Sequence, residues 1–350
     1  MEPAAGTREP RRLKIVADAA APLARSAAFC IFPNLEETAQ EKHGGRIMLR
    51  ERSWIGRSEE RRDVIAPWPA AALHAALDLP GEPPQKGDLL PPLWRWMYFL
   101  ETRRRSELGR EGAPERGGDL NPPLKLPRRL WTGGRLVFKR QIKVGANATR
   151  FSQIKDLRRQ KGPQGDRAFL TVAHEVRTAD GVMETEEQDV VFRPEREPDP
   201  TADRAHWLEA REDESWIRVW TADPMLLFRY AALTYNAHRI HYDLDFCRES
   251  EGYSGLLVQS TLLATLMLEL AREQGPDKRI AEFEFRTVSP VLHTEAFEVC
   301  GRPFEIEEEA ATRNGGAKLR SGADLWVRAA GPSGRWGGRL AMSGRLTYVE

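Results

Sequence analysis

Apolar and polar positions along the chain follow the same succession twice, from helical stretches to strand-like runs. In the second half, Asp223-Pro224 predicts the start of a helix that continues through Leu233. A further helix is predicted over 261–271, where TLLATLMLELA is apolar on every side and therefore indicates burial. Strands are predicted at 280–288, 295–301, 323–329 and 338–348, several with clean alternation.

The first half shows the same order of elements. Asp63 is predicted to cap a helix that reaches Leu77, and Pro91 and Pro92 are predicted to open a second helix that reaches Leu100. Strands are predicted at 135–142, 168–177 and 187–193. A buried helix followed by antiparallel strands suggests a sheet wrapped around that helix, and the same order twice suggests duplication.

Two stretches, 101–129 and 194–215, are polar, rich in turn residues and without an apolar period. We expect both of them to be exposed linkers. The second divides the chain into two parts that are each long enough to bury a core, which agrees with the two domains expected for 350 residues.

Composition and charge exclude several classes of protein. The 53 Lys and Arg against 52 Asp and Glu give a net charge of +1, so no global field would draw the protein to nucleic acid or to a membrane. The three cysteines lie far apart, which favours a reducing compartment and argues against a structural zinc site. No apolar run reaches the ~20 residues of a membrane span. Residues 1–44 carry no signal-type apolar region, so we expect a disordered start on a cytoplasmic protein.

The densest polar cluster is TYNAHRIHYD, residues 234–243, at the predicted end of an apolar helix. Four interpretations are open: a polar cap with His238, Arg239 and His241 at the negative end of the helix dipole; a metal site from His238 and His241; an acyltransferase-like spacing of His238 and Asp243; or an acid/base pair of Asn236 and His241, as a thioester hydratase needs.

The motif FRYAALTYNAHRIHYD, within residues 223–258, resembles the MaoC-like hot-dog hydratases and dehydratases of acyl-CoA thioesters. It is most similar to the branch of mesaconyl-C4-CoA (3-methylfumaryl-CoA) hydratase, itaconyl-CoA hydratase and hydroxyacyl-thioester dehydratase, in which FRYSALTFNAHRIHYD is characteristic. Motifs of the first half, among them WTGGRL from Trp131 and EQDVVFR from Glu187 with its neighbours, occur in the order found in that branch. The resemblance covers roughly residues 45–345.

This resemblance implies an α+β fold, a double hot-dog with two antiparallel sheets, each wrapped around a long helix. Residues 45–195 would form a non-catalytic hot-dog similar to the N-terminal dehydratase domain of the branch. Residues 196–215 would be a linker, and 216–350 would form the MaoC-like hot-dog that carries the catalytic pair.

The wider family has the hydratase motif D-x-N-P-x-H, and aligning its His with His241 places Asn236 on the catalytic Asp. An amide cannot take up a proton, so the resemblance implies that His241 carries the acid/base step while Asn236 orients the water. Where the family has a His-Gly pair at the start of the buried helix, this chain has Gln259-Ser260. Backbone N–H groups near Ser260 would hold the thioester oxygen.

The implied reaction interconverts a 2-enoyl-CoA and a 3-hydroxyacyl-CoA, with a short branched dicarboxyl-CoA as the favoured substrate. No metal or redox cofactor is implied; coenzyme A enters as part of the substrate, and the expected assembly is a homodimer of double hot-dog chains. The alternatives are a non-catalytic acyl-thioester binding subunit, which the Gln259-Ser260 change would support, and a hydroxyacyl-carrier-protein dehydratase of fatty acid synthesis.

Other marked residues allow two interpretations each. Arg239 and Arg286 could meet the pyrophosphate of coenzyme A or form ordinary ion pairs. Trp94, Trp96 and Tyr98 could line an acyl pocket or pack in the core, and the core is favoured.

Overall fold

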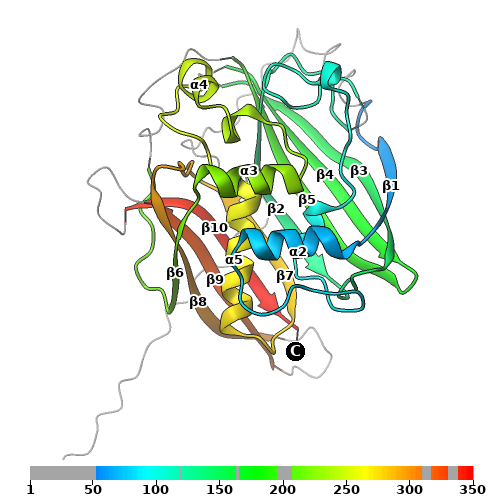
Figure 1. The fold of residues 1–350 in the computed structure, drawn as a ribbon, viewed down its shortest axis with the longest axis vertical. Coiled ribbons are helices and arrows are strands. Elements are labelled where there is room, and N and C mark those ends of the chain that lie inside the picture. The colour runs from blue at the N-terminus through cyan, green and yellow to red at the C-terminus, as the bar shows by residue number, and fades with distance from the viewer. Residues whose placement is uncertain are drawn as a thin grey trace, which may run out of the picture. The chain divides into compact units, whose positions relative to one another are not determined.

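Ten antiparallel strands form one continuous sheet in the computed structural model, which describes residues 53–118, 120–162, 165–195, 207–309, 317–329 and 338–349. Across the sheet the order is β1-β3-β4-β5-β2-β7-β10-β9-β8-β6 (Figure 1). The strands are β1 (Ser58–Val64), β2 (Arg128–Phe138), β3 (Asn147–Gln160), β4 (Arg167–Thr178), β5 (Gly181–Arg193), β6 (Trp216–Thr221), β7 (Ile280–Thr287), β8 (Ala296–Glu309), β9 (Ala317–Ala329) and β10 (Arg339–Tyr348).

The strand order repeats itself about the β2–β7 pair at the centre of the sheet. Each strand of the first half has a counterpart at the same place in the chain order of the second half. The pairs are β1 and β6, β3 and β8, β4 and β9, β5 and β10, and β2 and β7. This order confirms the α+β double hot-dog and the duplication. The two predicted sheets are joined into one, because β2 pairs directly with β7 from Gly133↔Arg286 to Val137↔Glu282.

The two helices predicted in the second half are present. Helix α3 (Pro224–Leu233) begins at Asp223, whose side chain accepts a hydrogen bond from the Leu226 N–H at 2.8 Å. Helix α5 (Ser260–Gln274) lies across β6, β8, β9 and β10 (Figure 1), and every residue from Leu262 to Ala271 is buried. Burial on all sides is what its continuous apolar sequence requires.

Within the described residues the first half has no counterpart of α5, so the predicted second long helix is wrong. The stretch from Pro91 to Leu100 forms only a short 3₁₀ turn, η1 (Trp94–Met97). Leu93 and Phe99 have φ values of 69° and 58°, a left-handed conformation that a right-handed helix cannot contain.

Contacts made by Asp63 and Arg95 explain this backbone. Asp63 accepts a hydrogen bond from the Phe99 N–H at 2.7 Å instead of capping α2 (Pro67–Ala76), whose N-cap is Ala66. The Arg95 side chain is only 2% exposed and pairs with Glu184 and Glu186 on β5. Because a buried charge must be paired, these contacts override the local preference for helix.

The prediction that 101–129 is an exposed linker holds for most of 101–110 and is wrong for 111–129, where most of the described residues are buried or half-buried. Its turn-rich backbone is held by side chains: the Asn121 amide donates to the carbonyl oxygens of Pro114 and Glu115 at 3.0 and 2.9 Å. With these groups satisfied, the segment packs on the sheet. It contributes two leucines to a buried cluster of Trp54, Leu124, Leu126, Ile154, Leu157, Ala168, Leu170, Val172 and Phe192.

Three strands were not predicted, and two of them, β1 and β6, form the edges of the sheet. β1 has the sequence SEERRDV, in which exposed and half-buried positions alternate without an apolar contrast. Charged edge strands of this kind resist pairing with other chains. The predictions for residues 1–44 and for most of the linker, 196–206, lie outside the described residues. None of the described helices is long and apolar enough to span a membrane.

Candidate active site

The end of α3 places the polar cluster. The chain leaves the helix through Tyr235, a non-glycine residue with φ 50°, and the Asn236 N–H reaches back to the Ala231 carbonyl at 2.8 Å. This is the Schellman type of helix end. Backbone groups and the Thr234 hydroxyl therefore occupy the last carbonyls of α3, and the polar-cap interpretation of the cluster is not the arrangement found.

His241 is buried and has one fixed ring nitrogen. Its Nδ1 lies 2.8 Å from the Leu257 carbonyl oxygen, so Nδ1 carries the proton and donates. Within the described residues Nε2 has no hydrogen-bond partner. Burial lowers the pKa of His241 to about 4. The ring is consequently neutral near pH 7, with Nε2 as a proton acceptor.

His238 lies beside His241, with the ring centroids 5.6 Å apart and the rings nearly perpendicular. Its Nε2 is 3.8 Å from a carboxylate oxygen of Glu111. Burial, followed by the nearby His241 and several arginines, holds the pKa of His238 well below its usual range. The Asn236 side-chain oxygen accepts a hydrogen bond from the His238 backbone N–H at 3.0 Å, which leaves the Asn236 amide nitrogen as a donor.

The segment that His241 contacts leads directly into α5. The Leu257 N–H donates to the Ile240 carbonyl at 2.9 Å, and α5 begins three residues later at Ser260. The first amides of a helix have no partner within it, so Ser260 and the next residues offer N–H donors there. Gln259 is 2% exposed; its amide nitrogen donates to the Leu227 carbonyl at 3.1 Å, and its side-chain oxygen is buried without a partner.

A loop of the first half supports the cluster from the other side. The Arg239 N–H donates to the Glu111 carbonyl at 2.8 Å. Gly112, with φ 83°, sits so close to Ala237 that a Cβ atom would come within 1.9 Å of the Ala237 carbonyl oxygen. Only glycine fits at this approach. The segment predicted to be a linker is thus a part of the site.

A shallow surface hollow opens between this cluster and the start of β2. Sequence reasoning missed several of its residues, because nothing in the sequence brings a loop of the first half against the second half. The one sequence signal available was the pair of adjacent arginines, Arg128 and Arg129, at the start of β2. The lining consists of Glu111, Arg128, Arg129, Leu130, His238, Ile240, Glu251 and Tyr253.

The other candidates have structural roles. Arg239 pairs with Asp243 at 2.8 Å, and Asp243 also caps α4 (Leu244–Phe246), so the His238–Asp243 spacing does not form an acyltransferase pair. Arg286 pairs with Glu284 on its own strand. Among the described residues no group of three or more His, Cys, Asp or Glu side chains is placed to hold a metal ion.

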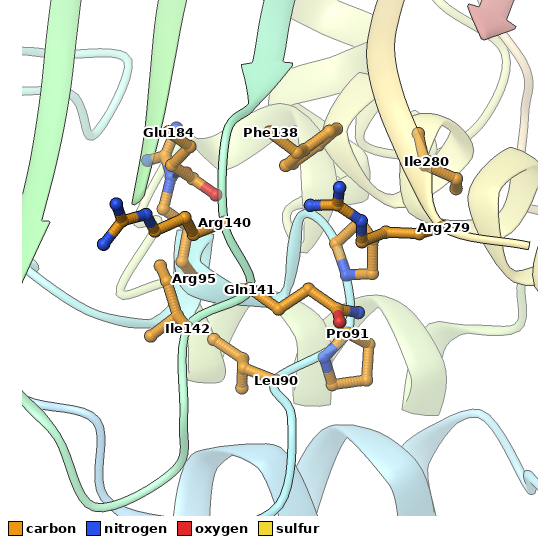
Figure 2. Close-up of a pocket in the computed structure, with 11 residues that line it drawn as sticks. Leu90, Pro91, Arg95, Phe138, Arg140, Gln141, Ile142, Glu184, Arg279 and Ile280 are labelled. Atoms are coloured by element: carbon orange, nitrogen blue, oxygen red, sulfur yellow. Dashed lines mark ion pairs between the residues drawn. The ribbon is translucent and has the colours of Figure 1, made fainter. Parts of the chain in front are cut away.

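The three aromatic residues of the first half pack as the core interpretation predicts. Trp94 and Tyr98 are buried, and the Trp94 indole N–H donates to Glu269 of α5 at 2.8 Å. A second hollow, beside η1, is shown in Figure 2. Its lining is Leu90, Pro91, Pro92, Arg95, Phe138, Arg140, Gln141, Ile142, Glu184, Arg279 and Ile280.

Comparison with known proteins agrees with this fold and identifies the family. A family model described as hydroxyacyl-thioester dehydratase type 2 matches residues 93–293. A mesaconyl-C(4)-CoA hydratase of Chloroflexus aurantiacus is 36% identical over 275 residues, which are 78% of this chain and 97% of that protein.

Two solved structures share the fold. A MaoC-like dehydratase superposes with a TM-score of 0.60 at 12% identity, over 85% of this chain and 99% of that chain. A Mycobacterium tuberculosis protein described as a double hotdog gives 0.51 at 15% identity, over 84% and 96%. Taken with the family match over more than half of the chain, these findings place the chain in the hydroxyacyl-thioester dehydratase type 2 family of MaoC-like hot-dog proteins.

Proposed function

We propose that this protein hydrates a short, branched dicarboxyl-CoA thioester such as mesaconyl-C4-CoA or itaconyl-CoA. Its family membership makes it an acyl-CoA hydratase/dehydratase, a hydro-lyase that interconverts 2-enoyl and 3-hydroxyacyl thioesters. The acyl group is proposed from the relative that carries the mesaconyl-C(4)-CoA name and aligns over nearly its whole length.

The observation that carries the mechanism is the fixed, neutral His241. Its Nδ1 proton is committed to the Leu257 carbonyl, so Nε2 can take a proton from a water molecule. The oxygen of that water attacks the β-carbon of the enoyl thioester. Electrons move through the double bond to the thioester oxygen, and the proton held by His241 is then given to the α-carbon, so that the elements of water are added across the bond.

Two further groups of the second half assist this reaction. The free amide nitrogen of Asn236 can donate a hydrogen bond to the attacking water. The backbone N–H groups at Ser260 and beyond face the negative charge that develops on the thioester oxygen, and the N-terminus of a 15-residue helix favours that charge. The first half, 45–195, contributes the Glu111 loop and the start of β2, and we assign it no catalytic residue.

The test is a panel of thioesters followed by the loss or gain of the conjugated chromophore. It should include mesaconyl-C4-CoA, itaconyl-CoA, crotonyl-CoA and the 3-hydroxyacyl products. Turnover of at least one CoA ester, with a preference for the dicarboxyl substrates, is expected. If CoA esters bind tightly and none reacts, the protein is a binding subunit; if only carrier-protein thioesters react, it belongs to fatty acid synthesis.

A further inference from the structure

The hollow beside His238 contains several charged side chains, and most of them are paired. Arg128 pairs with Glu251 at 2.5 Å. Arg116, just behind the hollow, donates to the Pro127 carbonyl at 2.8 Å and lies 3.4 Å from Glu111. These two guanidinium groups are occupied by the protein itself.

Arg129 is different. Its side chain lines the hollow and is half-buried, yet within the described residues it makes no ion pair and its guanidinium no hydrogen bond. Its charge acts at a distance on Glu111, whose carboxylate it favours, and on His238, whose protonation it opposes. A partly buried cation that the fold leaves unpaired is suited to an anionic ligand.

The register of β2 sets the direction of this side chain. Arg129 lies opposite Phe192 on β5, so the two side chains share a face of the sheet. Phe192 is fully buried on that face, under the guanidinium of Arg116 at 4.7 Å from the ring centroid. Arg129 therefore projects to the side of the sheet covered by the Glu111 loop, where His238 lies.

The proposed substrate supplies an anion at this place. In mesaconyl-C4-CoA, which is 3-methylfumaryl-CoA, the free carboxylate is attached to the β-carbon, the atom that water attacks. A group that binds this carboxylate must therefore lie within a few bonds of the acid/base histidine. In the hollow, Arg129 combines two features: it lies beside His238, whose ring is 5.6 Å from that of His241, and its guanidinium is unoccupied among the described residues.

We propose that Arg129, contributed by the first half, binds the free carboxylate of a dicarboxyl-CoA substrate and so determines the acyl group that the second half hydrates. This inference rests on the proposed function, because the carboxylate is positioned relative to the reacting carbon. Arg129 is thus a specificity residue. The planar guanidinium can hold both carboxylate oxygens at once.

The experiment compares Arg129→Ala with wild type on mesaconyl-C4-CoA and on crotonyl-CoA, which has the same coenzyme but no carboxylate. A hydrogen-bonded charge pair corresponds to roughly a 10- to 100-fold loss of kcat/KM on the dicarboxyl substrate. Crotonyl-CoA turnover should change less than about threefold on the same scale. Arg129→Lys should recover part of the lost activity, because lysine keeps the positive charge but cannot hold both carboxylate oxygens as the planar guanidinium does.

Arg158→Ala is the matched control, since Arg158 is an exposed arginine of the same half that pairs with Asp156 on its own strand. It should leave both rates unchanged. Equal losses on both substrates in Arg129→Ala would assign Arg129 to coenzyme binding or to structure and overturn the proposal. An unchanged rate on mesaconyl-C4-CoA would overturn it as well.

A binding measurement keeps the proposal separate from the proposed function. Succinyl-CoA and butyryl-CoA have four-carbon acyl groups without a double bond and differ in one terminal carboxylate. Calorimetric titration should show that Arg129→Ala weakens the binding of succinyl-CoA more than that of butyryl-CoA. This result is expected whether or not the protein hydrates any thioester. If wild type hydrates crotonyl-CoA and does not distinguish succinyl-CoA from butyryl-CoA, the hydratase function stands and the role of Arg129 falls.

Discussion

The two halves of the molecule build the same helix end and then diverge. Helices α2 and α3 each have ten residues, and each is followed by a left-handed residue, Asp78 with φ 47° and Tyr235 with φ 50°. The next N–H then reaches back five residues into the helix, from Leu79 at 3.2 Å and from Asn236 at 2.8 Å. One backbone motif therefore presents an apolar side chain in the first half and an amide in the second.

A second divergence lies where the long helix begins. The Leu90 N–H donates to the Ile142 carbonyl, just after β2, at 2.8 Å. The equivalent bond in the second half runs from the Val258 N–H to the Val291 carbonyl, just after β7, at 2.9 Å. The following two residues are Pro91-Pro92 in the first half and Gln259-Ser260 in the second. Proline has no N–H, so the first half has no amide donors at this position.

The comparison indicates why we assign the proposed catalysis to the second half. A thioester hydratase needs a proton acceptor beside a group of N–H donors, and the second half has both within one stretch of chain. In the first half, the hollow beside Pro91 and Pro92 (Figure 2) contains one carboxylate, Glu184, which is paired with Arg95. The first half keeps the sheet that completes the fold and lends side chains to the other half's site.

The largest effect is expected from a charge in α5, a helix without a counterpart among the described residues of the first half. Leu266 is fully buried in α5, so Leu266→Asp places an unpaired carboxylate in the core, at a cost of several kcal/mol against roughly 5–15 kcal/mol of total stability. We expect no cooperative melting by calorimetry. Trp68→Asp on α2, where Trp68 is 72% exposed, is the control and should fold. A Leu266→Asp protein of near-normal stability would refute the packing of α5.

The proton acceptor is tested by removing one histidine from each half. His241→Ala should lower kcat by ~10²–10⁴-fold with KM little changed, because the general base is lost and binding is not. His74→Ala, on α2 of the first half, should retain wild-type kcat. His238→Ala should cost less than His241→Ala. Steady-state kinetics decide, and a wild-type rate in His241→Ala would remove this residue from the mechanism.

The donors at α5 are tested by transplanting the proline of the first half. Ser260 is the first residue of the helix, where proline is tolerated, and Gln259 already has the extended conformation that precedes proline. Ser260→Pro should therefore fold normally and lose roughly 10²–10³-fold in kcat, the typical effect of one oxyanion donor. Ser260→Ala keeps the N–H and should keep the rate. Equal rates in the two variants would contradict the assignment.

The residue that follows the shared helix end is tested by exchange. Asn236→Leu introduces the residue of the first half and should lower kcat by roughly 10-fold or more, since the water loses its donor. Asn236→Asp restores the residue of the wider family and should keep measurable activity. The outcome that would count against the role of Asn236 is full activity in the leucine variant.

The smallest effect is on the pH dependence of stability. Burial lowers the pKa of both His174 in the first half and His241 in the second to about 4. An unfolded histidine titrates near 6.5, so between these values the unfolded chain binds more protons and stability falls as the pH falls. The Tm should drop between pH 7 and 5. His174→Gln should flatten this slope without changing kcat/KM, and an unaltered slope would contradict the assignment.

Much of the second half could be predicted from sequence, for reasons that are local. The Asp223-Pro224 start and the continuous apolar run of α5 each specify their element within a short stretch, and both were confirmed. The cluster with Asn236 and His241 was found by its density of polar residues and by resemblance. Their catalytic roles remain predictions.

The first half shows what local pattern could not supply. Its apolar stretch after Pro92 reads as a helix, yet Arg95 is drawn into buried ion pairs with Glu184 and Glu186, about 90 residues away in sequence. The β1 strand has no apolar alternation to detect. Long-range pairing of this kind overrides local propensity.

The sequence by itself determined the helices α3 and α5, the strands that follow them and the polar cluster at the end of α3, because helix caps and apolar periodicity act over a few residues. Only the tertiary structure decided that the two sheets join through β2 and β7 and that the segment 101–129 packs against the cluster. It also placed Arg129 beside His238, more than 100 residues away. Contacts between distant segments depend on which buried charges and backbone groups find partners, and that is settled only when the whole chain is packed.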